Sequence, residues 1–586
     1  MEHKPLARTV LARWRHARIF GLGDRAAPAA FTPGLCLTSQ DPEMDVEMAP
    51  FSIEHNSEQL PATLSITARG AWAYPFGEND VPTYMADEGH TLPPSLQDAD
   101  SGLGQSTGPL LPVSWQRLVH DATLLDPELS PDIIVIQDAV QLAGHPGRLV
   151  QTIHLIRERF PAALLWAPGL GGPDNCAILS WFGLDLFDLR RSQQAAAHGI
   201  LLSRDGPRHL DSTSGESADM ETQLSEWLAS LAATRAAIQA GTIRELVEKQ
   251  SLNSPRLVEH LRRHDALLSG SVPLSMHVDK GQRFRCHSAV SREDPLVQDW
   301  IHRIENEYMP DEIQRETLVL LPCSARKPYS RSQSHRFFRS AIRNRRVHQV
   351  MVTSPLGLVP RELEEQWPAA HYDVPVTGDW DDDELTTIRR LVKTLVERVG
   401  YTTVINHSGI DFEIETIDTR PEGVGASSKA ACEVLRQAIE SIEGEPMREK
   451  AFLRHAFSSL SRWQFGTDAW MEGLHVGGKP PRWMLLKGKQ QMAQWHPDSG
   501  RFSFTKSILP TLRETGTLRE VEIGGDSPWK GDIFPGMVVS APEDLKIAEE
   551  ILIIRNGELL GSARCMAAGW EWKCGAGRLA KSQHRL

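Results

Sequence analysis

Three short apolar runs in the second half of the chain are each followed by a polar residue that can take part in chemistry. The runs are TLVLL, VHQVMV and YTTVIN, and Cys323, Ser354 and His407 follow them within two positions. An amphipathic segment at helical spacing, PLVQDWIHRIENEYM, precedes the first run. Alternating helices and strands are typical of a parallel α/β sheet, in which ligands bind beyond the carboxyl ends of the strands. We therefore expect these three polar residues to meet at one cleft.

The rest of the chain predicts further domains, because 586 residues are too many for one hydrophobic core. A first α/β unit starts near Asp132, where the strand-like PDIIVIQDA and AALLWAP alternate with the helical LVQTIHLIRERF and CAILSWFG. Residues 1–125 predict only short strands, residues 222–269 predict helix, and the stretch 418–430 is typical of a linker. The last 70 residues are short strands between Gly and Pro turns, which predicts a small β-barrel.

Composition excludes several classes of protein. Apolar residues make up 40% of the chain and charged residues 24%, as in an ordinary globular protein. The seven cysteines are scattered, without a CxxC pair or a His/Cys cluster at zinc spacing, so we expect no metal, no cofactor and a reducing compartment. No window approaches the ~18 apolar residues that cross a bilayer, and the N-terminus lacks an apolar signal core. The sequence predicts a cytoplasmic protein.

One basic stretch stands out in a chain whose formal net charge is −13. Residues 321–350 contain no Asp or Glu but eight cations: Arg326, Lys327, Arg331, Arg336, Arg339, Arg343, Arg345 and Arg346. Local charge matters more than the total for attraction to phosphate. This stretch therefore predicts contact with a nucleic acid, with a solvated basic helix face as the alternative. By contrast, the acidic run 379–384 predicts the first turn of a helix.

The segment from Pro322 to His335 fits the pattern PC-x3-KPY-x2-S-x2-H without gaps. This pattern resembles the signature of archaeosine synthases, archaeal enzymes related to tRNA-guanine transglycosylases. The segments VTSPLGLVPREL (352–363) and AAHYDVPVTGDW (369–380) are similar to that family as well. So are WAPGLGGPDNCAILSWFGLDLFD (166–188), which resembles late strands of the transglycosylase barrel, and KGDIFPGMVV, GELLGSAR and GRLAKSQHR, which resemble an RNA-binding PUA domain.

The resemblance implies an α/β multidomain protein with four domains. These are a TIM-barrel-like transglycosylase domain over 1–275, a parallel α/β catalytic domain over 285–420, a small α+β domain over 430–513 and a PUA β-barrel over 517–586. The chain lacks the CxCxxC zinc site of active transglycosylases and their PTR motif after Asp188. Asp185 and Asp188 align with the transglycosylase nucleophile region, but we expect the barrel to be a degenerate, non-catalytic scaffold.

The resemblance also implies the reaction. Archaeosine synthases add a nitrogen nucleophile to the nitrile of 7-cyano-7-deazaguanine at position 15 of tRNA, which gives an amidine or a lysine-adduct precursor. The nitrogen comes from glutamine, or from lysine in the version that works with a radical-SAM lyase partner. A homodimer is a further expectation, since transglycosylases often dimerise. The alternatives are a tRNA-guanine(15) transglycosylase that exchanges bases, and a non-catalytic subunit that binds tRNA.

Roles for the motif residues follow from that reaction. Cys323 lies beside Arg326 and Lys327, and nearby cations lower a thiol pKa, so we expect a thiolate that attacks the nitrile and forms a thioimidate. His335 would exchange a proton near neutral pH. Lys327 would bind the amino-acid carboxylate or a phosphate, and Tyr329 would stack on the base or donate a hydrogen bond. The competing roles are a buried, inert thiol for Cys323 and ordinary packing or surface positions for the others.

The candidate site residues form three groups. The expected catalytic residues are Cys323, Lys327, Tyr329, Ser332 and His335, and the expected substrate-binding residues are Ser324, Arg326, Arg331, Ser354 and His407. The expected RNA-binding residues are Arg336, Arg339, Lys530, Arg578 and Arg585. For Ser324, Ser332 and Ser334, a turn or helix N-cap role is equally compatible with the sequence.

Overall fold

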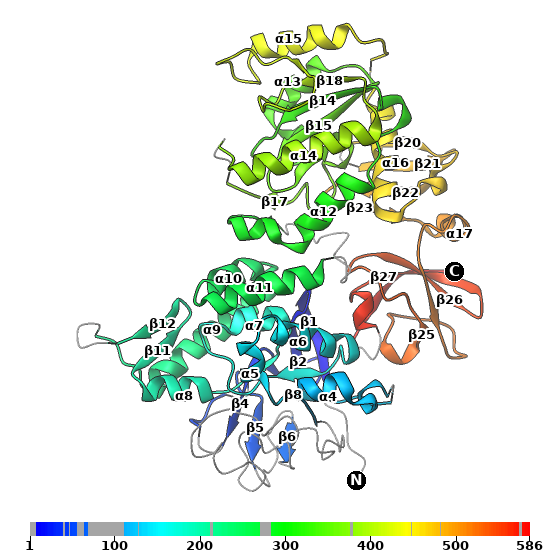
Figure 1. The fold of residues 1–586 in the computed structure, drawn as a ribbon. Coiled ribbons are helices and arrows are strands. Elements are labelled where there is room, and N and C mark those ends of the chain that lie inside the picture. The colour runs from blue at the N-terminus through cyan, green and yellow to red at the C-terminus, as the bar shows by residue number, and fades with distance from the viewer. Residues whose placement is uncertain are drawn as a thin grey trace. The chain divides into compact units, whose positions relative to one another are not determined.

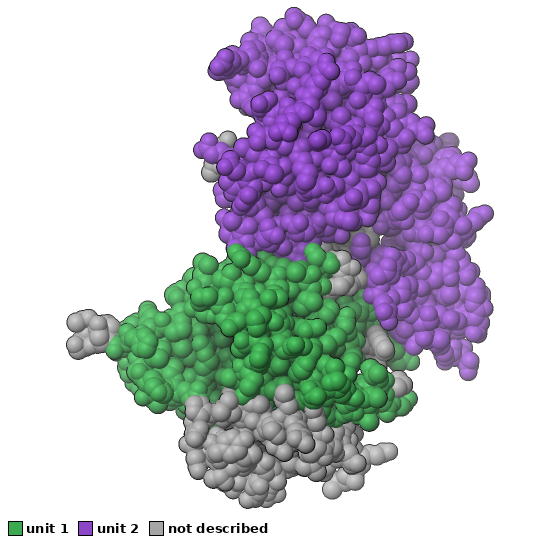
Figure 2. All heavy atoms as spheres, in the orientation of Figure 1, with its two compact units in different colours: residues 1–272, 534–536, 567–579 green, residues 273–533, 537–566, 580–586 purple. Residues whose placement is uncertain are grey.

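The structure is a computed structural model, and the chain divides into two compact units, which Figure 2 colours separately. It describes residues 7–38, 41–45, 47–54, 64–67, 110–126, 128–210, 215–269, 283–375, 379–446, 448–480, 482–572 and 577–586. Unit 1 comprises residues 1–272, 534–536 and 567–579, and unit 2 comprises residues 273–533, 537–566 and 580–586. Both units mix helices with several sheets, as the α/β prediction requires.

A seven-stranded parallel sheet forms the centre of unit 1. Its order is β6-β5-β4-β10-β9-β8-β7, so the last of these strands along the chain pairs with the first. The strands are β4 (Gly34–Thr38), β5 (Phe51–Glu54), β6 (Leu64–Thr67), β7 (Leu110–Val113), β8 (Ile133–Ile136), β9 (Leu164–Trp166) and β10 (Leu186–Phe187). Among the described residues, β6 and β7 are the two ends of this order, and no pairing joins them.

Helices and two small sheets complete unit 1. The helices are α4 (Trp115–His120), α5 (Ala139–Gly144), α6 (Arg148–Arg159), α7 (Cys176–Phe182), α8 (Arg190–Ala197), α9 (Met220–Ala240), α10 (Ile243–Ser251) and α11 (Pro255–Leu268). The small sheets join β1 (Arg8–Trp14), β2 (Ala17–Gly23) and β3 (Pro28–Phe31), and β11 (Ile200–Ser203) with β12 (Gly206–His209). The strands and helices predicted between residues 132 and 182 and the helices predicted over 222–269 are thereby confirmed.

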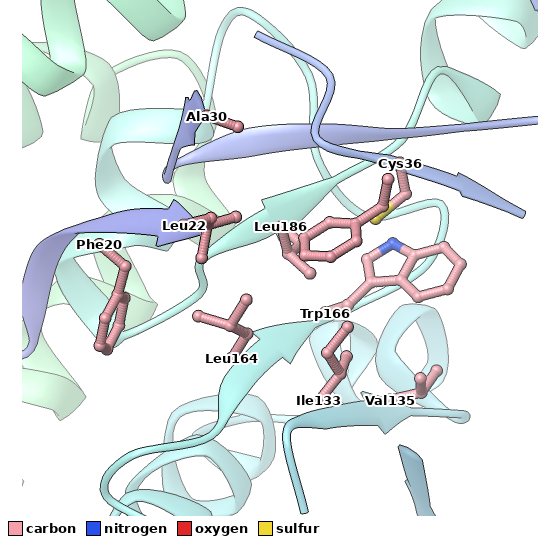
Figure 3. Close-up of a cluster of buried hydrophobic side chains, with 10 residues drawn as sticks. Phe20, Leu22, Ala30, Cys36, Ile133, Val135, Leu164, Trp166 and Leu186 are labelled. Atoms are coloured by element: carbon pink, nitrogen blue, oxygen red, sulfur yellow. The ribbon is translucent and has the colours of Figure 1, made fainter. Parts of the chain in front are cut away.

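The core of unit 1 explains why its strands are continuous apolar runs. Leu164 and Trp166 on β9, Ile133 on β8 and Leu186 on β10 are fully buried and pack in one cluster with Phe20 of β2, as Figure 3 shows. Parallel strands covered on both faces need apolar side chains at successive positions. Burying each large apolar side chain stabilises the fold by about 1.5–3 kcal/mol.

A five-stranded sheet forms the centre of unit 2, in the order β16-β15-β14-β18-β19. Its strands are β14 (Thr317–Pro322), β15 (Val347–Thr353), β16 (Gly357–Pro360), β18 (Thr403–Asn406) and β19 (Ile417–Asp418). Strand β14 pairs in parallel with both β15 and β18, so Leu320 lies opposite Val350 on one side and Asn406 on the other. The three predicted apolar runs therefore do end at the same edge of one sheet.

Four helices flank this sheet (Figure 1). They are α12 (Pro295–Asn306), α13 (Gln333–Ala341), α14 (Asp382–Val399) and α15 (Lys429–Glu440). Helix α14 begins as the acidic run predicted, because the Asp381 and Glu384 side chains form a capping box. Strand β19 lies at the start of the predicted linker, and α15 packs on α13, where Asn344 Nδ2 donates to the Ile442 carbonyl at 3.0 Å.

The remainder of unit 2 is largely antiparallel. A two-stranded sheet joins β13 (Phe284–Arg285) with β17 (Tyr372–Asp373), and helix α16 (Glu449–Phe465) precedes a four-stranded meander, β20 (His475–Lys479), β21 (Arg482–Lys487), β22 (Gln490–His496) and β23 (Arg501–Phe504). After α17 (Leu509–Glu514), a five-stranded sheet runs in the order β25-β24-β26-β27-β28. Its strands are β24 (Glu520–Ile523), β25 (Val538–Ser540), β26 (Glu550–Arg555), β27 (Glu558–Cys565) and β28 (Ala580–Arg585), and only β24 and β26 are parallel.

A buried histidine cluster makes the stability of unit 1 depend on pH. His16 is buried beside His264, His154, Arg157 and Arg18, and burial together with these cationic or titratable neighbours holds its pKa well below the usual value of 6.5. The folded state therefore binds fewer protons than the unfolded state. We expect the protection of unit 1 amides from hydrogen exchange, corrected for the intrinsic pH dependence, to fall as the pH drops below about 6.5.

A matched pair of variants tests this expectation. His16→Gln should make the protection of unit 1 less sensitive to pH, since it removes a group that the unfolded chain protonates. His209→Gln, at an exposed position of β12, should leave the sensitivity unchanged. Equal pH dependence in wild type and His16→Gln would contradict the assignment.

Candidate active site

Cys323 lies at the edge where strands β14, β15 and β18 end. It follows Pro322, the last residue of β14, and it is half-buried. The hydroxyl of Thr353, the last residue of β15, acts to lower the pKa of the thiol. On the other side, the His407 N–H donates to the Leu320 carbonyl at 2.9 Å, which holds the end of β18 against β14. The backbone of a parallel sheet thus positions the thiol.

Four side chains form a hydrogen-bonded and cationic cluster around this thiol. Lys327 Nζ lies 3.9 Å from the centre of the Tyr372 ring. The Tyr372 hydroxyl hydrogen-bonds the Thr353 hydroxyl at 2.7 Å and also the Tyr329 hydroxyl. Burial raises the pKa of both tyrosines, so they remain protonated hydrogen-bond donors. The cluster therefore combines a thiol, an amine and two phenols at one strand end.

Burial outweighs charge at this site. Desolvation raises the pKa of Cys323 above its usual value, although the Thr353 hydroxyl and the Lys327 ammonium each act to lower it. The expectation that neighbouring cations would lower this pKa was wrong in its net direction. Desolvation destabilises the thiolate more than the Lys327 ammonium stabilises it. Desolvation likewise lowers the pKa of Lys327. Both changes favour the neutral pair of thiol and amine.

His335 is held as a neutral structural side chain. It is fully buried, and Arg361 Nη2 lies 2.8 Å from its Nδ1, which must therefore accept the hydrogen bond. Desolvation and the positive charge of Arg361 lower its pKa to about 2. This environment disfavours the predicted proton exchange by His335 near neutral pH. The contact with Arg361 assigns His335 the role of fixing α13. The other ring nitrogen, Nε2, is buried without a hydrogen-bond partner among the described residues.

The serines of the motif region serve the backbone. Ser332 caps α13, since its hydroxyl accepts from the His335 N–H at 3.2 Å, and it also hydrogen-bonds Ser334. Ser324 donates to the Arg326 carbonyl at 3.1 Å. At the end of β15, Ser354 donates to Glu384 Oε1 at 2.5 Å. A capping hydroxyl contributes about 0.5–2 kcal/mol to helix stability, which accounts for Ser332 without a catalytic role.

The remaining predicted residues differ in exposure. His407 is fully buried, and its ring nitrogens contact the Thr419 hydroxyl and the Ala426 carbonyl at 2.9 Å each, so it fixes a loop rather than facing a ligand. Arg326, Arg331, Arg336 and Arg339 are exposed. None of these four arginines has an ion-pair partner among the residues that the structure describes. They remain available to phosphate.

The predicted RNA-binding residues near the C-terminus are only partly brought together. Lys530 and Arg585 are exposed, and Arg585 Nη1 donates to the Lys530 carbonyl at 3.1 Å. Arg578 is half-buried and belongs to the other compact unit. Their roles remain predictions.

Three contributors to the site were not singled out from the sequence: Thr353, Arg361 and Tyr372. A signal existed, since Thr353 ends one of the three apolar runs and the other two lie in segments 352–363 and 369–380, which resemble the same family. The contacts of Arg361 and Tyr372 with the motif span 26 and 43 residues along the chain. Motif spacing alone does not reveal such partners.

The two acidic residues of unit 1 that align with a transglycosylase nucleophile are both engaged. Asp188 is buried and accepts from Trp166 Nε1 at 3.0 Å, the Gly169 N–H at 2.8 Å and the Arg190 N–H at 3.0 Å. Asp185 forms a buried ion pair with Arg157 at 2.5 Å. Neither carboxylate is free to attack a substrate.

Within the described ranges, no group of three or more His, Cys, Asp or Glu side chains is arranged to hold a metal ion. In the same ranges, no helix is long and apolar enough to cross a membrane.

Comparisons with known proteins agree with the motif. A family model described as domain of unknown function DUF5591 matches residues 297–441, from α12 through α15. The archaeosine synthase subunit alpha of Methanosarcina acetivorans is 30% identical over 501 residues, which covers 75% of this chain and 77% of the relative. The archaeosine synthase of Haloferax volcanii is 28% identical over 463 residues, covering 73% and 77%.

Two weaker similarities complete the comparison. The tRNA-guanine(15) transglycosylase of Methanothermobacter thermautotrophicus is 28% identical over 262 residues, or 39% of this chain and 38% of the relative. A crystal structure described as a protein of unknown function is 27% identical and covers 49% of this chain and 99% of its own, with a TM-score of 0.39.

The raised pKa of Cys323 predicts slow alkylation. We expect the iodoacetamide reaction of this thiol, followed by peptide mass spectrometry, to accelerate with pH and to have its midpoint above that of a free cysteine. Lys327→Met should move the midpoint higher, because the ammonium stabilises the thiolate. Lys393→Met, at an exposed position of α14, should leave it unchanged. A midpoint below that of free cysteine would contradict this account.

The contact between His335 and Arg361 predicts a stability effect. His335→Ala leaves one buried guanidinium nitrogen without its acceptor, so we expect unit 2 to lose about 1–3 kcal/mol of unfolding free energy. Gln333→Ala, at an exposed position of the same helix, should cost much less. In any active His335 variant, the loss of activity at low pH should occur at the same pH as in the wild type. A shift of that pH would show that His335 does titrate during catalysis.

Proposed function

This chain belongs to the archaeosine synthase family, and from this membership we propose that it forms archaeosine, or its amino-acid adduct, from 7-cyano-7-deazaguanine in tRNA. The observation that best supports this proposal is the cluster around Cys323 at the edge of the unit 2 sheet. Cys323, Lys327 and Tyr329 of this cluster belong to the segment that resembles the family. The relatives named archaeosine synthase match about three quarters of the chain.

The proposed reaction proceeds through Cys323. The sulfur adds to the nitrile carbon, the thiol proton moves to the nitrile nitrogen, and a thioimidate forms. The donor amine then attacks the same carbon, the C–S bond breaks, and the proton lost by the amine returns to the sulfur. The product is an amidine and the free thiol is regenerated. Adding the amine thus needs no change of oxidation state and no metal ligand.

Lys327 is the proposed proton carrier. A lysine with a lowered pKa spends more time as the neutral amine, which takes a proton from a thiol or a donor ammonium. Tyr329 and Tyr372 stay protonated and offer hydrogen bonds to the developing charge on nitrogen. Ser324, Arg326 and Arg331 would meet the donor carboxylate or the phosphates near the base.

Two other functions fit the observations less well. Base exchange by a transglycosylase needs a free carboxylate nucleophile, whereas Asp185 and Asp188 are both engaged. The two relatives with that name are 28% identical over 39% of the chain and 23% identical over 77% of it. A purely tRNA-binding subunit leaves the buried cluster of thiol, amine and phenols without a purpose. If the purified protein incorporated labelled free deazaguanine base into tRNA, base exchange would again be the better explanation.

Finer features of the architecture are also proposed. The ring-like order of the parallel sheet in unit 1, in which β10 pairs with β4, supports a degenerate TIM-barrel-like scaffold that helps to hold tRNA. The C-terminal sheet, together with its resemblance, supports a PUA domain. A cytoplasmic location agrees with a tRNA substrate. Several relatives are named as an alpha subunit, which supports a partner protein, such as a radical-SAM lyase, and a homodimer remains an expectation.

Mass spectrometry of digested tRNA tests the function and the donor together. Incubation of cyano-deazaguanine tRNA with the full-length protein and either lysine or glutamine should give a lysine adduct or the amidine, respectively. Only one donor is expected to react. If the tRNA stays unchanged with both donors, even when the proposed partner protein is added, the proposed function would be overturned.

Loss of the thiol should abolish most of the activity. Cys323→Ala is expected to lower kcat by at least about a hundredfold, since removal of a nucleophile costs several kcal/mol of transition-state stabilisation. Cys565→Ala, at a buried thiol on β27, should retain activity. Trapping of a tRNA adduct on Cys323 in the absence of donor would support the thioimidate. Full activity of Cys323→Ala would remove the thioimidate while leaving the family function intact.

A further inference from the structure

Helices α13 and α15 enclose a groove on unit 2 that the Cys323 chemistry does not use. Its volume is about 830 Å³, and it is lined by residues of both helices and by the segment 442–446 that follows α15. Figure 1 shows the two helices side by side. The lining includes the apolar side chains Phe337, Ala341, Ile439, Ile442 and Pro446. The groove is large enough for a small organic group, since ligand pockets span about 300–1,000 Å³.

Phe337 is the unusual side chain of this groove. Its neighbours His335 and Phe338 are buried towards the sheet, whereas Phe337 is 46% exposed. The exposed arginines Arg336 and Arg339 lie on the same helix but outside the groove lining. A single exposed apolar residue needs no explanation, but an exposed aromatic ring that faces a groove lined by cations is the combination that proteins use to stack an unpaired base.

The charge around the groove favours an anionic occupant. Arg343 and Lys429 both line it, and neither has an ion-pair partner among the residues that the structure describes. Arg436 also lines the groove, but it pairs with Glu433. Two carboxylates face it as well, Glu440 and Glu445, and Glu445 pairs with Arg345 at 3.2 Å. The free cations, together with Arg336 and Arg339, leave a local positive excess.

We propose that this groove binds an unstacked nucleotide of the tRNA substrate, with its base against Phe337 and its phosphate near Arg343 and Lys429. The proposal rests on the proposed function, because it takes tRNA as the substrate. Helix α13 is nine residues long, or about 14 Å, which equals roughly four stacked nucleotides of one strand. The helix starts at the end of the Pro322–His335 segment. The groove would therefore hold a nucleotide within about four positions of the reacting base.

Binding of cyano-deazaguanine tRNA to the full-length protein tests the stacking partner. Phe337→Ala should weaken binding by roughly fivefold to a hundredfold, which corresponds to the loss of one base–aromatic stack. Phe337→Trp should restore binding, because it keeps an aromatic face. Val434→Ala, at a partly exposed apolar position of α15 outside the groove lining, should bind like wild type. Wild-type affinity in Phe337→Ala would overturn the proposal.

The salt dependence of binding separates the phosphate contacts from stacking. Arg343→Ala and Lys429→Ala should each reduce the slope of log affinity against log salt by about 0.7, the value for one lost phosphate contact on a single strand. Phe337→Ala should lower affinity without changing that slope. Lys393→Ala removes one positive charge at an exposed position of α14 and should leave the slope intact. Unchanged slopes in both groove variants would overturn the phosphate assignment.

Two further readouts distinguish this proposal from the proposed function and from a protein partner. In product formation, Phe337→Ala should raise KM for tRNA while kcat stays near wild type. A wild-type protein that binds tRNA through Phe337 but forms no product would contradict the proposed function and not the groove. A photoreactive phenylalanine at position 337 should crosslink to tRNA. Crosslinking to a partner protein in place of tRNA would overturn the proposal.

Discussion

Strand β14 lies between two parallel neighbours, and five of its six residues are buried. Its carboxyl end is therefore fixed on both sides by β15 and β18, and the backbone leaves the sheet at Pro322. Cys323, the next residue, therefore lies at the edge where all three strands end. The Ser332 cap and the contact between His335 and Arg361 fix helix α13, which follows this edge in the chain. The position of the chemistry thus depends on sheet pairing more than on any side-chain contact.

Burial sets the electrostatics of the same edge. The sequence predicted a thiolate at Cys323 beside two cations, and a histidine that exchanges a proton near neutral pH. In the folded protein, desolvation raises the pKa of Cys323, lowers that of Lys327 and keeps His335 neutral. A neutral thiol and a neutral amine together suit addition to a nitrile, because the proton released by sulfur is needed on the nitrile nitrogen. The low-dielectric site therefore retains the proton that the reaction must transfer.

Local sequence patterns predicted the elements of the site but not the contacts between them. Apolar runs predicted β14, β15 and β18, the acidic run predicted the start of α14, and the motif located Cys323. The sequence could not rank desolvation against charge at Cys323, because burial depends on the whole fold. Nor could it pair Tyr329 with Tyr372 or His335 with Arg361, since each contact joins segments 26 to 43 residues apart. Barrel closure in unit 1 stays a prediction, as residues 68–109 lie outside the described ranges.

In the proposed function, the buried face of α13 supports catalysis and its exposed face supports recognition of tRNA. Its buried face, with His335 and Phe338, anchors the helix to the sheet that positions the thiol. Its exposed face carries arginines without carboxylate partners in the described chain, next to a groove with an exposed aromatic ring. An acidic protein can bind a polyanion only where such a face concentrates positive charge. Because both faces belong to one helix that begins at the motif, a nucleic acid held on the outer face is brought to the edge where the thiol stands.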